Sequence, residues 1–263
     1  MNCKICHSNA EILFNAKVLG KYDVKYFRCT NCEYIFTEKP YWLEEAYKHA
    51  INIFDTGILE RNLYFRKLVS ILIYFFFERQ KKFLDYAGGY GIFTRLMRDA
   101  GFDFYWDDPF CENIMAKGFE YNSNEMKNIR LLTAFEVFEH LDNPVDELEK
   151  MLKISKNIVF STELIPVTLP EPDEWWYYAF EHGQHISFYS KKTLEELAGK
   201  FNLHFYSYKN LFLFTDKKLN RIVFNLVMSL NKIGLFMVLK KVLKSKTMED
   251  HYELRKNFNK NTQ

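Results

Sequence analysis

A glycine-dense turn between a predicted strand and a predicted helix constrains this chain most. The apolar run Phe83–Asp85 ends in an acid, and Tyr86-Ala87-Gly88-Gly89-Tyr90-Gly91 follows it directly. From Ile92 onward, apolar residues recur at helical spacing until Gly101 ends the pattern. The segment therefore predicts a strand, a turn and a helix, in which glycines let the backbone approach a ligand closely. A tight turn without a ligand is the alternative interpretation of the same glycines.

A second predicted strand ends in two carboxylates. Phe104–Trp106 is aromatic, and Asp107-Asp108-Pro109 follows it. An acid at the end of the second strand of an open α/β sheet can accept hydrogen bonds from a ribose diol. A solvated turn beside the proline is the alternative. The glycine turn lacks both the Gly-Lys-Ser/Thr of a Walker loop and the complete Gly-x-Gly-x-x-Gly of dinucleotide-binding folds.

In these motifs, residues 60–215 resemble the class I S-adenosylmethionine-dependent methyltransferases. The first motif of that family, Asp-x-Gly-x-Gly-x-Gly, corresponds to the run from Asp85 to Gly91, with Ala87 in place of the first glycine. The family's Glu-Val-Leu-Glu-His-Leu-x-x-Pro motif corresponds to the run from Glu136 to Pro144.

This resemblance implies an α/β fold with a doubly wound, mostly parallel, seven-stranded sheet, and S-adenosylmethionine as the cofactor. The residues that it assigns to the cofactor are Asp85, Ala87, Gly88, Gly89, Gly91, Phe135, Glu136 and Asp108, with Asp107 as the alternate acid.

Four cysteines near the N-terminus have the spacing of a metal site. Cys3 and Cys6 form one Cys-x-x-Cys pair, and Cys29 and Cys32 form a second. Two such pairs place four thiolates tetrahedrally around zinc, and four cysteine ligands leave no position for a reactive water. We therefore predict a structural Zn²⁺ in a small N-terminal ribbon. Cysteines used in this way also favour a reducing, cytoplasmic location.

Length and composition predict one large domain with smaller additions. The chain has 263 residues, 48% of them hydrophobic, and a formal net charge of +2, which argues against nucleic-acid binding chiefly through charge. No N-terminal signal pattern and no apolar run of membrane-spanning length are found. The predicted domains are a zinc ribbon at 1–38, a helical connector at 39–80, a cofactor-binding domain at 81–217 and a helical extension at 218–263.

The segment 170–189 is rich in aromatic, histidine and acidic residues. It lies between a predicted strand and a predicted helix, where loops line the ligand crevice of a doubly wound sheet. Histidine titrates near neutrality and can accept a proton from a substrate hydroxyl. The alternative is that His182 and His185 are only hydrogen-bonded residues at the entry of a helix.

The same segment resembles bacterial sugar C-methyltransferases, which act on nucleotide-linked deoxysugars and also carry a four-cysteine zinc segment. Their Tyr-x-Glu-His-x-Ser-Tyr pattern implies His185 as the catalytic histidine, and it puts Gln184 at the family's glutamate. Removal of a proton from carbon needs a strong base, and a glutamine side chain cannot act as one. The sequence therefore favours O-methylation of a nucleotide-activated sugar or a related surface-polysaccharide precursor, with His185 as base and His182 and Glu181 orienting it.

Two other functions remain open. A zinc-ribbon RNA methyltransferase would need a basic stripe interleaved with aromatic residues, which residues 1–40 lack. A non-catalytic scaffold of the same fold would explain Ala87 and Gln184 as marks of lost activity.

The C-terminal segment alternates apolar residues with lysines, among them Lys240, Lys241, Lys244 and Lys246. Such an amphipathic stretch contacts a membrane surface or another subunit, or it covers the edge of the sheet.

Overall fold

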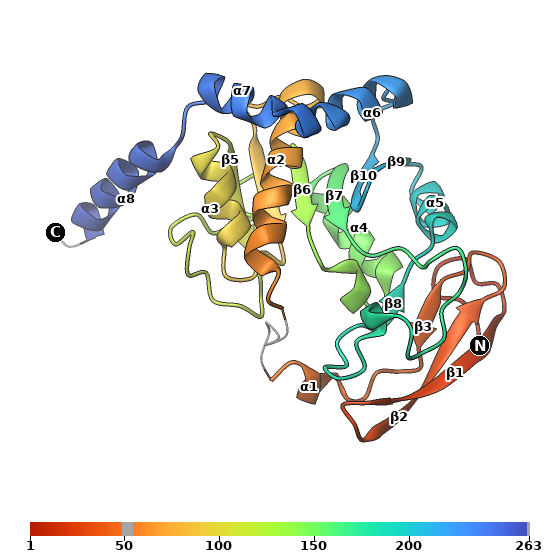
Figure 1. The fold of residues 1–263 in the computed structure, drawn as a ribbon. Coiled ribbons are helices and arrows are strands. Elements are labelled where there is room, and N and C mark those ends of the chain that lie inside the picture. Colours follow the sequence, from red (N-terminus) through yellow and green to blue (C-terminus); the bar gives the residue numbers. More distant parts are fainter. Residues whose placement is uncertain (49–54, 262–263) are drawn as a thin grey trace. The chain divides into compact units, whose positions relative to one another are not determined.

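The computed structural model describes residues 1–48 and 55–261 (Figure 1). The chain divides into two compact units, Met1–Asn52 with Ala134–Lys218 and Ile53–Thr133 with Leu219–Gln263. Its strands form a four-stranded sheet of order β1-β2-β3-β8 and a six-stranded sheet of order β5-β4-β6-β7-β10-β9. Strand β4 pairs in parallel with β5 and β6, and β10 pairs antiparallel with β7 and β9. The predicted α/β class with a mostly parallel sheet and an additional small N-terminal sheet is confirmed.

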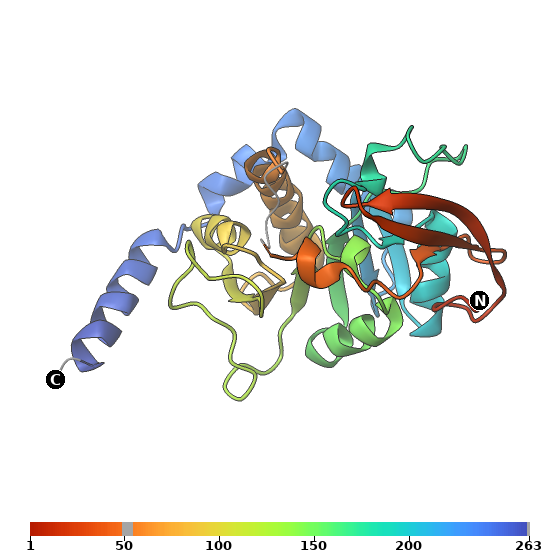
Figure 2. The same ribbon diagram turned by 90° about the horizontal axis from the view of Figure 1, so that it is seen from below.

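The N-terminal sheet of the first unit is antiparallel. It consists of β1 (Ala10–Val18), β2 (Tyr22–Cys29), β3 (Ile35–Thr37) and β8 (Ser187–Phe188), and the short helix α1 (Leu43–Ala46) follows β3. Figure 2 shows β1 and β2 as a long hairpin. Strand β3 pairs with β8, which comes about 150 residues later, through Ile35 with Phe188. The ribbon is therefore completed by a strand from the predicted substrate segment.

The aromatic residues of that segment pack mainly on the ribbon. Trp175 and Tyr178 are buried in one cluster with Tyr26 and Trp42, and the Trp42 indole donates to the carbonyl of Gly183 at 2.8 Å. Burial of one such side chain stabilises the fold by about 1.5–3 kcal/mol. Side chains of this segment thus form part of the hydrophobic core that covers the N-terminal sheet.

The remaining elements of the first unit are η1 (Phe138–His140), α4 (Pro144–Ile154), β7 (Asn157–Ser161), η2 (Trp176–Tyr178), α5 (Lys191–Lys200), β9 (His204–Tyr208) and β10 (Leu211–Thr215). Helices α4 and α5 both begin at residues that cap them with their side chains. The Asn143 side chain accepts from the Asp146 amide with Pro144 at the first helical position, and Ser190 forms a capping box with Thr193.

The second unit contains the predicted strand, turn and helix. Its elements are α2 (Ile58–Phe76), β4 (Lys82–Tyr86), α3 (Ile92–Asp99), β5 (Asp103–Asp107), β6 (Leu131–Ala134, of which the last residue belongs to the first unit), α6 (Arg221–Ser229), η3 (Leu230–Ile233), α7 (Leu235–Val242) and α8 (Thr247–Asn261).

The larger sheet has six strands in the described part of the chain, where seven were predicted. The segment between β5 and β6 contributes only an isolated bridge between Trp106 and Glu120. Its polar side chains make local bonds instead, because Asn113 donates to the carbonyl of Ala116 and to Glu120. Such local bonds compete with a strand ladder.

A buried ion pair attaches α8 to this unit. Arg98 donates from Nε and Nη2 to the two oxygens of Asp250 at 2.8 and 2.7 Å, and both side chains are almost fully buried. The same guanidinium donates to Asp103 and lies 3.6 Å from the ring centroid of Phe119. The C-terminal helix, which projects beyond α3 in Figures 1 and 2, is therefore anchored at its first turns.

We predict that Asp250→Ala lowers the free energy of unfolding by about 3 kcal/mol, because Nε and Nη2 of the buried Arg98 lose their carboxylate and only Nη1 keeps one, that of Asp103. Urea unfolding followed by circular dichroism measures this. The control Glu112→Ala removes an exposed ion pair with Lys117 and should cost under about 1 kcal/mol. Equal effects of the two substitutions would show that the Arg98 pair does not anchor the helix.

Candidate functional site

The glycine turn adopts a backbone that only small residues fit. Ala87, Gly89 and Gly91 have φ of 53°, 54° and 80°, in the left-handed region. A Cβ on Gly88 would lie 2.8 Å from Asp85 Oδ2 and 2.8 Å from Trp106 Cδ1. The turn therefore packs directly on the ends of β4 and β5, and the alanine accepts a conformation that glycine adopts more easily.

Asp85 stabilises the turn through hydrogen bonds to neighbouring elements. Its carboxylate is buried and accepts hydroxyl hydrogens from Thr133 at 2.8 Å and Thr94 at 3.1 Å. Burial raises the pKa of Asp85 to about 7, and the two hydroxyl bonds oppose that rise. The side chain thus joins β4, β6 and α3, and both of its oxygens are used by the protein itself.

The two acids after the second strand differ in their partners. Asp108 accepts from the Gly89 amide at 2.9 Å through Oδ2 and from the Phe110 and Cys111 amides through Oδ1. Asp107 is half-buried, and its carboxylate has no hydrogen-bond partner among the described residues. Burial raises the pKa of Asp107, and the Asp108 charge adds to this. Asp107 is therefore the acid with free acceptors for a ribose.

Phe135 and Glu136 follow β6 directly in the chain and belong to the first unit. Glu136 has φ of 53°, its amide donates to Ser161 Oγ at 2.9 Å, and Ser161 Oγ donates to Glu136 Oε1 at 2.6 Å. This reciprocal pair fixes the residue at the end of β7.

Three histidines and a glutamate gather in the first unit. The ring centroids of His140 and His185 lie 5.0 Å apart, and those of His185 and His182 lie 4.9 Å apart. Ligand atoms of Glu139, His140 and His185 all lie within 4.8 Å of one another, so these three residues could hold a metal ion. The predicted pair His182 and His185 is therefore brought together, along with two residues that the sequence analysis did not select.

The tautomers of two histidines follow from their contacts. His185 Nδ1 lies 2.7 Å from the Tyr177 carbonyl, and His140 Nδ1 lies 3.0 Å from the Gln184 carbonyl. A carbonyl only accepts, so each Nδ1 carries the hydrogen and each Nε2 keeps a lone pair when the ring is neutral. Burial lowers the pKa of His185 well below its usual value and that of His140 to about 4. Both rings are neutral at pH 7.

Glu139 is a buried carboxylate whose oxygens lack a hydrogen-bond partner of normal geometry among the described residues. Burial raises its pKa to about 8, the Glu136 charge adds to the rise, and the hydroxyls of Tyr177 and Thr162 lower it. An unsatisfied buried carboxylate is costly unless a proton or a cation neutralises it.

The other predicted catalytic positions are peripheral. Glu181 is exposed. Burial lowers the pKa of His182, and the charge of Glu181 opposes that shift. His182 Nδ1 accepts from the Gln184 amide at 3.2 Å. The buried Gln184 side chain donates to the carbonyl of Ala46 at 2.8 Å, which makes it a structural contact.

The four predicted cysteine ligands lie together. Cys3 and Cys32 sulfurs are 3.6 Å apart and those of Cys6 and Cys29 are 3.4 Å apart, and none forms a disulfide. A tetrahedron with Zn–S bonds of about 2.3 Å has sulfurs about 3.8 Å apart. Three backbone amides donate to these sulfurs at 3.4 Å, those of Ile5, Asn31 and Cys32. The chemistry of this donor set fits zinc.

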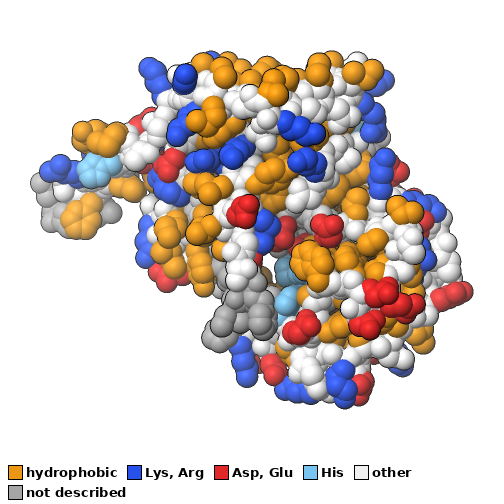
Figure 3. Space-filling view, in the orientation of Figure 1, with side chains coloured by type: hydrophobic (Ala, Val, Ile, Leu, Met, Phe, Trp, Pro, Cys, Tyr) orange, Lys and Arg blue, Asp and Glu red, His pale blue; other side chains and the backbone are white. Residues whose placement is uncertain are grey.

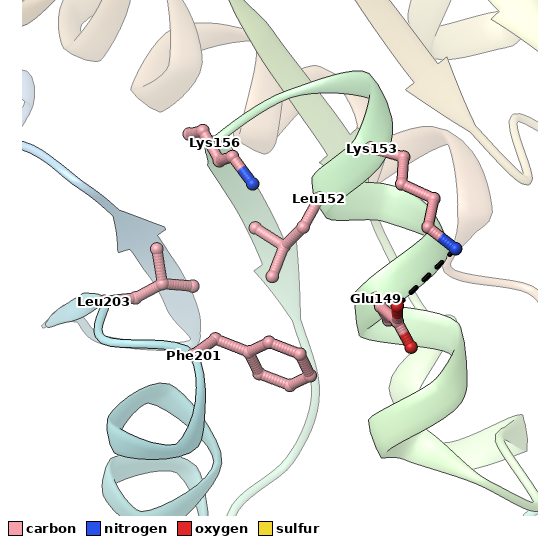
Figure 4. Close-up of a pocket in the computed structure, with 6 residues that line it drawn as sticks. All are labelled: Glu149, Leu152, Lys153, Lys156, Phe201 and Leu203. Carbon is pink, nitrogen blue, oxygen red and sulfur yellow. Dashed lines mark ion pairs between the residues drawn. The ribbon is translucent and has the colours of Figure 1, made fainter.

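A surface hollow of about 200 Å³ between α4 and the end of α5 holds none of these residues (Figure 4). Leu152, Phe201 and Leu203 line it, together with the Glu149–Lys153 ion pair at 3.5 Å. Its side chains offer no convergent chemistry, so it is not the site.

The chain resembles known proteins at two levels. The model of the methyltransferase-domain family matches residues 60–208, which is more than half of the chain. A comparison with curated proteins finds no match. Among solved structures, TnmH has 15% identity over 67% of this chain and 60% of that chain, with a TM-score of 0.48.

Two further structures are similar at this level. The mitomycin 7-O-methyltransferase MmcR has 12% identity over 66% of this chain and 59% of that chain, with a TM-score of 0.47. An O-methyltransferase family protein from Burkholderia thailandensis has 12% identity over 66% of this chain and 61% of that chain, with a TM-score of 0.49. The chain therefore spans about three fifths of the length of these structures.

Asp107 and Asp108 have different partners, so we expect different effects from their substitution. Asp107→Asn should weaken S-adenosylhomocysteine binding about tenfold, because an amide retains one acceptor and loses the charge-assisted bonds to a ribose. Isothermal titration calorimetry measures the affinity. Asp108→Asn serves as the matched variant and should lower thermal stability, because it weakens three backbone bonds. Unchanged affinity in Asp107→Asn would exclude this acid as the ribose ligand.

Proposed function

Because this chain belongs to the methyltransferase-domain family, it is an S-adenosylmethionine-dependent methyltransferase, and we propose that it methylates a hydroxyl group of a small polar metabolite. The sulfonium of the cofactor makes the methyl group electrophilic, so the protein mainly aligns the acceptor with the methyl group and the leaving sulfur. The observation that carries the proposal is the neutral His185, whose Nδ1–H is held by Tyr177 and whose Nε2 can accept a proton.

The absence of a neighbouring carboxylate base at position 184 supports oxygen as the methylated atom. Gln184 is committed to the backbone of Ala46 and cannot remove a proton from carbon. A hydroxyl needs less help, because its proton can leave late in the transition state. We further propose that the acceptor is a nucleotide-activated sugar or a related polysaccharide precursor, on the resemblance of 182–188 to sugar methyltransferases.

The ribbon itself offers little to an RNA. Four aromatic rings of the ribbon, those of Tyr26, Phe27, Tyr34 and Phe36, are buried, and those of Phe14 and Tyr22 are half-buried. Bases of single-stranded RNA stack on exposed rings. This supports a small acceptor over an RNA, and turnover of any acceptor excludes the non-catalytic scaffold.

We predict that His185→Ala lowers kcat/KM by about 10²–10⁴-fold with little change in S-adenosylhomocysteine affinity, as loss of a general base does. Methyl transfer to a panel of nucleotide sugars, measured by mass spectrometry, tests it. His182→Ala is the matched control and should cost much less. A His185→Ala enzyme with full activity on an acceptor that the wild type methylates would rule out the imidazole as base.

Glu139, His140 and His185 favour a metal-assisted form of the same reaction. Each histidine donates its Nδ1–H to a backbone carbonyl, which is the usual orientation of a histidine ligand. The Glu139 carboxylate has no hydrogen bond of normal geometry among the described residues. Two imidazoles and a carboxylate suit Mn²⁺, Fe²⁺ or Zn²⁺. A divalent cation held there would use the Nε2 lone pair of His185 as a ligand. It would supply Lewis acidity that lowers the pKa of an acceptor hydroxyl, and would thus replace the imidazole base.

Glu139→Gln tests the metal-assisted form, because it keeps the shape of the side chain and removes its charge. Calorimetric affinity for Mn²⁺ should fall at least about tenfold, and chelation should abolish wild-type turnover until Mn²⁺ is restored. Equal Mn²⁺ binding by wild type and variant, with turnover that survives chelation, would leave His185 acting as a base alone.

We also propose that the four cysteines hold a structural Zn²⁺. Cys29→Ser should lose one equivalent of zinc, measured by mass spectrometry of the metal, and should lower the melting temperature by several degrees. Cys111→Ser, outside the cluster, is the control and should change neither. Full zinc content in Cys29→Ser would contradict the site.

A further inference from the structure

The C-terminal helices of the second unit have one buried and one exposed apolar face. Phe224 of α6 and Phe236 of α7 are buried, and both helices pack on α2, with the Phe224 ring 5.8 Å from that of Phe76. The opposite face presents apolar side chains that are more than half exposed, namely Ile222, Leu226, Ile233, Met237, Val238 and Val242. These helices therefore cover α2 and leave a second apolar surface outside.

Figure 3 shows hydrophobic side chains gathered along the edge where Figure 1 places α6 and α7, with Lys and Arg side chains beside them. Ile222 and Ile233 are 79% and 80% exposed, and an apolar patch of this kind marks an interaction surface.

Positive charge is concentrated on the same segment. Residues 217–246 contain eight Lys or Arg and no Asp or Glu. The net charge of the chain is +2, so all other residues together carry −6, the difference between +2 and +8. An apolar face bordered by cations, on a chain that is otherwise acidic, is complementary to an anionic lipid surface and not to a second copy with the same charge.

The geometry favours helices that lie in the membrane surface. Among described residues no single helix is long and apolar enough to cross a bilayer. The segments Arg221–Ile233 and Leu235–Val242 reach the length and apolar composition of a membrane-spanning helix only when taken together, and they meet at a bend of 89°. Gly234, with φ of 85°, forms the bend. Their inner faces are already used against α2, so only the outer face is free to enter lipid.

We propose that α6, η3 and α7 form a peripheral anchor that binds anionic phospholipid bilayers, with the six exposed apolar residues in the interface and the lysines at the headgroups. This surface consists of residues other than those of the proposed methyl transfer, so either proposal can fail alone.

Vesicle co-sedimentation of the full chain tests the anchor. The wild type should sediment with vesicles of equal phosphatidylcholine and phosphatidylglycerol, and should stay in solution with phosphatidylcholine alone or in high salt. Lys240→Glu with Lys241→Glu should lower the partition coefficient at least about 30-fold, at about 1 kcal/mol for each lysine. Leu226→Ser with Met237→Ser should lower it about tenfold or more by loss of apolar burial.

The matched control is Lys191→Glu with Lys192→Glu on α5, an adjacent exposed pair outside the surface. It should bind vesicles like the wild type, and calorimetric S-adenosylhomocysteine affinity should be the same in every variant. The proposal is overturned if the wild type does not sediment with anionic vesicles, or if the control loses binding as strongly as the Lys240 and Lys241 variant. It is also overturned if light scattering shows a dimer that the Leu226 and Met237 variant abolishes while vesicles remain unbound.

Discussion

Two backbone hydrogen bonds at Ile186 organise the first unit. The Ile186 amide donates to the Glu139 carbonyl at 2.9 Å, and the Ile186 carbonyl accepts from the Thr37 amide at 3.1 Å. They join the ribbon strand β3, the segment that carries His185 and the turn that carries Glu139 and His140. The side chains of Glu139, His140 and His185 lie close together because these hydrogen bonds fix their backbones. The same bonds hold the Glu139 carboxylate in its buried position. Loss of order in the ribbon would therefore also disturb the positions of His140 and His185.

The four-cysteine cluster lies at the other end of the same frame. The Thr193 hydroxyl donates to the Cys32 carbonyl at 2.7 Å, and the Tyr34 hydroxyl lies 2.5 Å from Ser187 Oγ. Structural metal in such a position stabilises a sheet too small to hold a core alone. The proposed zinc site and the histidines are thus connected through one stretch of backbone.

Local features of the fold could be predicted from the sequence. The glycine turn, the Asn143 and Ser190 caps and the cysteine pairs each depend on residues within a few positions, so spacing suffices to find them. The pairing of β3 with β8 could not be predicted in this way, because it joins strands about 150 residues apart. For the same reason Glu139 and His140 were recognised as part of a motif but not as neighbours of His185. The partners of Asp107 and Asp108 needed coordinates, since adjacent acids look alike in a sequence.

The most direct test is a crystal structure of the protein with S-adenosylhomocysteine and Mn²⁺, with anomalous data at the manganese edge. We predict the cofactor sulfur facing the cluster of Glu139, His140 and His185, with an anomalous peak bonded to these three residues. A metal held there would take the Nε2 lone pair of His185 and would act on the acceptor hydroxyl in place of the imidazole, whereas absence of the peak would leave His185 as the base. A cofactor whose sulfur points away from this cluster, or a protein that never retains the adenosyl compound, would contradict the account of methyl transfer at this site.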